Sequence, residues 1–153
     1  MAVRLSTLPA RVGFSGYEDA IVLTTTAEFK PIVASHVRED ERGLFVEAIN
    51  AGPWETVITG SMRAGGVLGD HYHKKTRMFF FLTTGRADVE VVDVSTGARR
   101  KCHLATHEGV YLEPNQAHAI RFAEASTFLL LKSTRYRKDD PDTFPFPVTQ
   151  RSA

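Results

Sequence analysis

Three histidines are the residues of this sequence best suited to moving a proton or holding a metal ion. His71 and His73 stand two residues apart, after a glycine-rich stretch and before the apolar run 78–82, and His118 lies in a later strand-like run. Side chains two apart on a β-strand point to the same face, so His71 and His73 should project together. On the inner face of a barrel they would line its cavity, where His118 could join them.

The residue types leave three roles open for these histidines. Moving a proton next to a carbonyl needs a base and an acid near neutrality, and an imidazole with a pKa of about 6.5 suits both. Three histidines could equally hold Zn²⁺, Fe²⁺ or Ni²⁺ with open positions for a ligand. They could also be ordinary structural or surface histidines.

Bulk properties narrow the class of protein. The 153 residues suit one domain, and the formal net charge of +1 gives no reason to expect nucleic acid or a membrane surface as a partner. The single cysteine, Cys102, excludes an intrachain disulfide and fits a reducing compartment. The start of the chain has no apolar signal region, so we expect a cytoplasmic protein.

The elements that must position the histidines are predicted to be β-strands. About ten short strand-like runs recur at spacings of roughly 8–12 residues, and no window carries a convincing helical period, which favours an all-β sandwich or barrel. The continuous apolar run 78–82 is typical of a strand buried on both faces, and 38–43 is interpreted as a charged turn. We expect an N-terminal arm or edge strands over 1–30, one domain over 31–148 and a short tail over 149–153.

Two motifs give the chain a resemblance to the cupins, a family of single-domain jelly-roll barrels. Gly65, His71, His73 and Gly85 have the spacing of the first cupin motif, and Met78 stands where that motif has a glutamate. Residues 109–118, ending in His118, resemble the second motif. Asn115 replaces the usual glycine of that motif, and asparagine tolerates the positive φ that such a turn requires.

Two groups within the cupins are closer. Residues 71–75 and 109–118 resemble the dTDP-sugar 3,4-ketoisomerases. Residues 40–43, 69–73 and 140–144 resemble the cupin domain of bacterial capsule-synthesis sugar-nucleotide enzymes. The resemblance implies a homodimeric isomerase or epimerase of keto-sugar nucleotides in carbohydrate biosynthesis, with no required cofactor. Two alternatives stay open: a three-histidine metal cupin acting on a non-sugar small molecule, and a non-catalytic ligand-binding cupin.

Proton transfer next to a keto group assigns roles to the histidines, and the resemblance to the ketoisomerases adds Tyr111. His71 is the expected base, His73 its partner or acid, His118 a group that orients or contacts substrate, and Tyr111 a proton donor or substrate contact. Met78 cannot supply the anionic oxygen of a metal cupin, so any metal would rest on the three histidines. A substrate pyrophosphate calls for cationic donors near the cavity, for which the candidates are Arg63, Lys74, Arg77, Arg121 and Lys132.

Overall fold

A computed structural model describes residues 28–149, so most of the expected N-terminal arm and of the tail lies outside the described residues. Within this range the chain forms β-strands and no helix. The strands are β1 (Ile32–Val33), β2 (His36–Asp40), β3 (Gly43–Glu47), β4 (Thr56–Met62), β5 (Val67–Tyr72), β6 (Met78–Thr84), β7 (Ala87–Asp93), β8 (Arg99–Leu104), β9 (Glu108–Leu112), β10 (Gln116–Phe122), β11 (Ser126–Lys132) and β12 (Phe144–Pro145).

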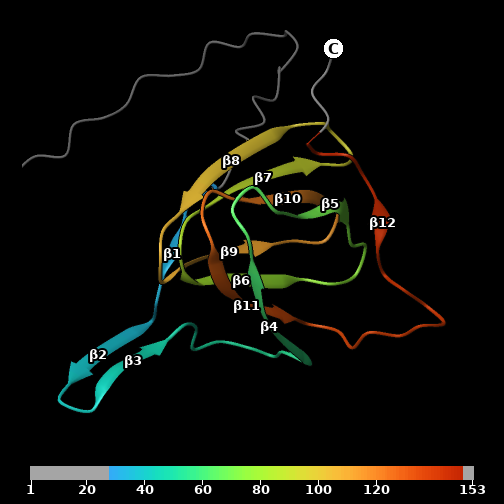
Figure 1. Cartoon of the computed structure of the whole chain (residues 1–153). Coiled ribbons are helices and arrows are strands. Elements are labelled where there is room, and N and C mark those ends of the chain that lie inside the picture. Colours follow the sequence, from blue (N-terminus) through green and yellow to red (C-terminus); the bar gives the residue numbers. More distant parts are fainter. Residues whose placement is uncertain (1–27, 150–153) are drawn as a thin grey trace, which may run out of the picture.

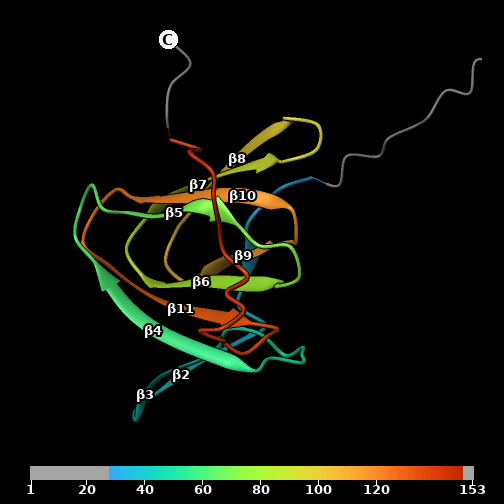
Figure 2. The same cartoon turned by 90° about the vertical axis from the view of Figure 1, so that its right-hand side faces the viewer.

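The strands build a two-layered jelly roll (Figure 1). One five-stranded sheet has the order β1-β9-β6-β11-β4, and the other has the order β12-β5-β10-β7-β8. Viewed from the side, the two sheets lie one above the other and enclose the space between them (Figure 2). The all-β prediction is therefore confirmed. No helix in the described part of the chain is long and apolar enough to cross a membrane.

Strand β6 explains where the core lies. Met78, Phe80 and Leu82 point between the sheets into the main apolar cluster, while Phe79 and Phe81 pack on the outer face. All five are at most 2% exposed, so the prediction of a strand buried on both faces is confirmed. Alternation of this kind gives one set of side chains to the cavity and the other to the outside of the barrel.

The segment 38–43 was wrongly expected to be a turn. Residues up to Asp40 belong to strand β2, and the turn itself is confined to Glu41 and Arg42. The Asp40 carboxylate accepts hydrogen bonds from the backbone N–H and the side chain of Arg42, which holds this tight turn. The resulting β2–β3 hairpin projects from the barrel (Figures 1 and 2), where charged side chains on a strand remain solvated.

Candidate functional site

Three imidazoles converge between the two sheets. His71 lies on β5 directly opposite His118 on β10, and His73 follows β5 by one residue. The ring centroids are 4.7 Å apart for His71 and His118, 5.0 Å for His71 and His73, and 5.8 Å for His73 and His118. One ring nitrogen from each lies within 4.8 Å of the others. The structure therefore brings together the three histidines that the sequence singled out.

A close approach of β5 to β10 at Gly69 sets this geometry. Gly69 has φ +119°, and a Cβ there would lie 2.4 Å from the carbonyl oxygen of His118. The pairing of the two strands shifts register between His118 and Ala119. Ala119 lies opposite Gly69, and His118 lies opposite His71. Asn115, in the turn before β10, has φ 62°, as predicted for the position where the second motif usually has glycine.

Backbone carbonyls fix the hydrogens on the three rings. The Nδ1 atom of His71 lies 2.9 Å from the carbonyl oxygen of Gly69, that of His118 lies 3.3 Å from the carbonyl of Gln116, and that of His73 contacts the carbonyl of Asp142. A carbonyl can only accept, so each Nδ1 donates its hydrogen and each Nε2 keeps its lone pair. The Nε2 atom of His73 is buried without a hydrogen-bond partner among the described residues.

Burial keeps these histidines uncharged. It lowers the pKa of His118 to about 3, and it is also the largest cause of the lowered pKa values of His71 and His73. The positive charge of Lys132 lowers all three pKa values further. At neutral pH the site thus presents three imidazoles ready to accept a proton or to bind a metal ion.

The cavity beside the cluster has a volume of about 210 Å³. His71, His118 and Lys132 supply its polar groups, and Met78 lies in its wall. Its remaining lining is apolar: Ile58, Leu68, Leu112, Ile120, Phe128 and Leu130. Burial lowers the pKa of Lys132. Ligand pockets usually measure about 300–1,000 Å³, so this one has room for a single sugar ring but not for a whole nucleotide sugar.

The donor set fits a metal ion bound by neutral nitrogen ligands. Among residues 28–149, the three histidines form the one group of three or more possible ligand residues that lie close enough to share an ion. Met78, which is 2% exposed, occupies the position of the expected carboxylate. Histidine ligands normally donate Nδ1–H to a carbonyl or carboxylate and present Nε2 to the metal, as these three are arranged to do.

Several residues predicted for the site lie elsewhere. Tyr111 packs on the outer face of its sheet against Trp54 and Phe79, away from the cavity that its neighbour Leu112 lines. The guanidinium of Arg77 lies 3.9 Å from the centroid of the Tyr111 ring, on that outer face. Neither residue is brought to the histidines.

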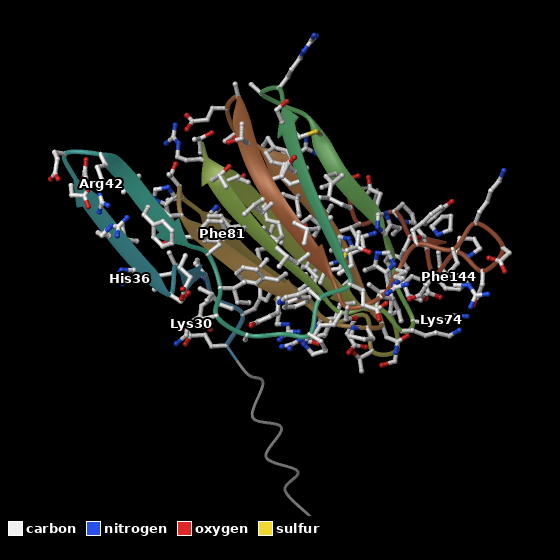
Figure 3. All side chains as sticks on the ribbon, turned by 90° about the horizontal axis from the view of Figure 1, so that it is seen from below. Lys30, His36, Arg42, Lys74, Phe81 and Phe144 are labelled. Carbon is white, nitrogen blue, oxygen red and sulfur yellow. The ribbon has the colours of Figure 1, made fainter. Side chains whose placement is uncertain are left out.

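Three other predicted cations also lie outside the cavity. Arg121 is exposed on the outer face of β10, and Arg63 is exposed after β4. Lys74 lies over the ring of Phe144 at the end of the barrel opposite the projecting hairpin (Figure 3). Of the five candidate cations, Lys132 alone lines the histidine cavity.

Sequence reasoning missed Asp142 as a part of the site. It placed this residue in a charged loop, whereas its carbonyl contacts His73 and its carboxylate binds the turn that follows His73. The segment 140–144 did carry a resemblance to the capsule-synthesis cupins, and that was the one available signal.

The neutral histidines predict that acid destabilises the fold. Below pH 6.5 the unfolded chain protonates its histidines, whereas the folded chain resists protonation, down to about pH 3 for His118. The unfolded state then binds more protons than the folded state. The free energy of unfolding therefore decreases as the pH decreases, by at most about 1.4 kcal/mol per pH unit for each histidine.

Urea unfolding of chelator-treated protein between about pH 7 and about pH 5 measures this slope. His118→Gln should flatten it, and the exposed His36→Gln serves as the control. An unchanged slope in His118→Gln would contradict a buried neutral His118.

The fold is shared with enzymes of sugar-nucleotide metabolism. A dTDP-4-dehydrorhamnose 3,5-epimerase from Sulfolobus tokodaii is 23% identical, with 67% of this chain and 69% of that chain covered and a TM-score of 0.60. A 3,4-ketoisomerase from Helicobacter canadensis is 18% identical, with 73% and 86% covered and a TM-score of 0.61. These likenesses confirm the cupin jelly roll that the motifs predicted.

A third structure is the capsular polysaccharide assembling protein CapF from Staphylococcus aureus, which is 19% identical with a TM-score of 0.59. The alignment covers 74% of this chain but only 32% of the CapF chain. No curated protein matches the sequence. Residues 38–144, well over half of the chain, match the family described as the polysaccharide biosynthesis C-terminal domain, and the chain therefore belongs to that family.

Proposed function

We propose that this protein is an isomerase or epimerase of keto-sugar nucleotides that moves a proton next to a keto group. The observation that carries the proposal is the convergence of three neutral imidazoles whose Nδ1 atoms are committed to carbonyls. Membership of a polysaccharide-biosynthesis family and a fold shared with sugar-nucleotide epimerases and ketoisomerases support this substrate class.

His71 is the proposed base, because it lines the cavity and is the least buried of the three. Its Nε2 takes the proton from the carbon next to the keto group. The C–H electron pair forms the enolate double bond, and the carbonyl electrons move onto oxygen. The Lys132 ammonium in the same cavity stabilises that oxygen. A proton delivered by solvent water to the opposite face of the same carbon, with His71 releasing its own proton to solvent, gives an epimer. Return of the proton by His71 to the neighbouring carbon, after proton exchange between the oxygens, gives an isomer.

The cavity is large enough for only one part of the substrate. The sugar ring would enter the 210 Å³ cavity, and the pyrophosphate and nucleoside would stay outside its mouth. His118, almost fully buried, would orient the ring, and His73 would act as partner to His71.

Exchange with solvent tests the reaction directly. Full-length protein is incubated in D₂O with dTDP- or UDP-linked 4-keto-6-deoxy sugars and examined by NMR and mass spectrometry. Deuterium at a ring carbon, together with a new isomer, is the expected result. Tight binding with neither product would overturn the proposal in favour of a ligand-binding domain.

A second candidate function is a three-histidine metal enzyme acting on a non-sugar small molecule. The buried, unpartnered Nε2 of His73 favours it, because an ion there would satisfy an atom that otherwise lacks a partner. His71, His73 and His118 would hold Zn²⁺, Fe²⁺ or Ni²⁺, and such an ion would polarise a bound oxygen atom. Metal analysis after zinc or iron supplementation tests it, and substoichiometric metal would count against it.

We further propose that the protein is a homodimer joined through its apolar projecting surface. Among residues 28–149, six of the seven exposed large apolar residues lie on β1, β2, β3 and β4: Val33, Val37, Leu44, Phe45, Val57 and Ile58, of which Ile58 also lines the histidine cavity. In the described part of the chain, β4 is the last strand of its sheet, and the β2–β3 hairpin pairs with neither large sheet. Isolated hairpins are marginally stable and free edges invite pairing, so a second copy would stabilise both.

Substituting Phe45 by glutamate should therefore weaken dimerisation by about tenfold or more, since it removes the burial of one aromatic side chain. Sedimentation velocity over a concentration series measures the change. Tyr136→Glu, at the exposed residue outside this surface, is the matched control and should stay dimeric. A wild-type monomer at micromolar concentration would refute the dimer.

A further inference from the structure

The geometry points to Asp142 as a positioning residue that fixes the ring of His73 within the histidine cluster. The inference builds on the proposed use of that cluster in the reaction. Asp142 reaches this region from the chain beyond β11, 69 residues after His73 in sequence. It touches the turn after His73 with its carboxylate and the His73 ring with its backbone carbonyl.

The carboxylate holds the turn with four hydrogen bonds. Oδ1 accepts from the backbone N–H of Lys74 at 2.8 Å, and Oδ2 accepts from the N–H groups of Lys75 at 2.9 Å and Thr76 at 2.8 Å. The hydroxyl of Thr76 donates to Oδ2 at 2.8 Å and lies 2.7 Å from that of Thr134. Hydrogen bonds to a charged group are the stronger kind, so residues 74–76 are fixed relative to Asp142.

The carbonyl of the same residue then sets the ring. It accepts the hydrogen of His73 Nδ1, which leaves Nε2 without a hydrogen, buried and without a partner among the described residues. A free histidine side chain prefers the opposite tautomer, with the hydrogen on Nε2, which could neither accept a proton nor bind a metal there. Asp142 therefore couples the conformation of the turn to the chemistry of His73.

The remainder of the C-terminal segment offers an internal control. Strand β12 pairs with His71 and Tyr72, and the N–H of Phe146 donates to the carbonyl of Asp70 at 2.9 Å. At its far end, Thr149 donates its hydroxyl to the Asp70 carboxylate at 2.8 Å and 3.0 Å. Thr149→Val loosens this segment at the far end without altering any group that touches His73.

Histidine NMR tests the inference independently of any reaction. Long-range ¹H–¹⁵N spectra of the full chain, treated with chelator, report which ring nitrogen carries the hydrogen. Wild type and Thr149→Val should show His73 with its hydrogen on Nδ1. Asp142→Ala should show a mixture of tautomers or the reverse one. Thr76→Val, which removes one of the four bonds, should give a smaller change and replaces Asp142→Ala if that variant does not fold.

A double-mutant cycle separates positioning from general stabilisation. Asp142→Ala should reduce turnover, or zinc affinity where zinc binds, by about 10–100-fold, as is typical when a residue supporting a ligand histidine is lost. In a His73→Gln background the same substitution should have less than about a threefold effect, because the two residues act through one contact. An undiminished effect in that background, or an unchanged His73 tautomer in Asp142→Ala, would overturn the inference. A changed tautomer in a protein that shows no isomerase activity would sustain it and refute only the proposed function.

Discussion

Replacing His71 by glutamine should slow deuterium incorporation into a keto-sugar nucleotide by about 10²–10⁴-fold, the contribution expected of one general base. Glutamine keeps a hydrogen-bonding side chain of similar reach but has no lone pair that accepts a proton at neutral pH. His71 is the imidazole that both lines the cavity and remains partly exposed, so a substrate carbon can approach it. Binding should change far less than turnover, because glutamine preserves the shape of the wall.

Single-turnover exchange rates in D₂O and titration with substrate separate the two effects. Arg86→Gln is the matched control: Arg86 is exposed and paired with Glu124, outside the cavity. It should exchange at the wild-type rate. If the exchange rate of His71→Gln stayed within about threefold of wild type, another residue would have to be the base. The main support for the proposed mechanism would then be lost.

The sequence could predict the histidine pair because its signals are local. The two-residue spacing of His71 and His73, and the alternation within 78–82, depend only on strand geometry. The glycine-rich stretch before the pair already contained Gly69, whose close approach to β10 aligns His71 with His118. Each of these predictions depends on the correct assignment of only one strand or of two neighbouring strands.

The placements predicted for Tyr111 and Arg121 were wrong because the face of a strand had to be known. Tyr111 and Leu112 are adjacent, yet one packs outside the sheet and the other lines the cavity. His118 and Arg121 differ by an odd number of residues along β10, so the chain places them on opposite faces. A shift of one residue in register exchanges the inward-facing and the outward-facing side chains of a strand, and composition alone does not fix that register.

The role of Asp142 was out of reach for a different reason. Its contacts join segments 66 to 69 residues apart in sequence, and they depend on where the loop after β11 returns to the barrel. From sequence alone, a charged loop is expected to be solvated. Only the fold shows that the carboxylate of Asp142 accepts hydrogen bonds from backbone N–H groups.

Replacing Met78 by glutamate should strengthen metal binding by at least about tenfold, equivalent to 1.4 kcal/mol. Met78 lines the cavity with His71 and His118, at the position of the carboxylate in the first motif. A glutamate there would add an anionic oxygen to the nitrogen donors of the cluster, a set that suits zinc and iron. The metal-free variant should be less stable than wild type, by about 3 kcal/mol, because a carboxylate would be buried at a residue now 2% exposed, with Lys132 on the neighbouring strand as its cationic neighbour in the cavity.

The substitution should thus lower the stability of the metal-free protein and raise its affinity for metal, and one experiment can detect both changes. Thermal unfolding with chelator and with excess zinc should show a low melting temperature without metal and a larger zinc-induced rise than in wild type. Met78→Gln, of similar size but neutral, controls for shape and polarity and should show little of this rise. Equal zinc affinities for the glutamate and glutamine variants would mean that no ion binds beside residue 78. That result would leave any metal site to His71, His73 and His118 alone, without a ligand from the neighbouring wall of the cavity.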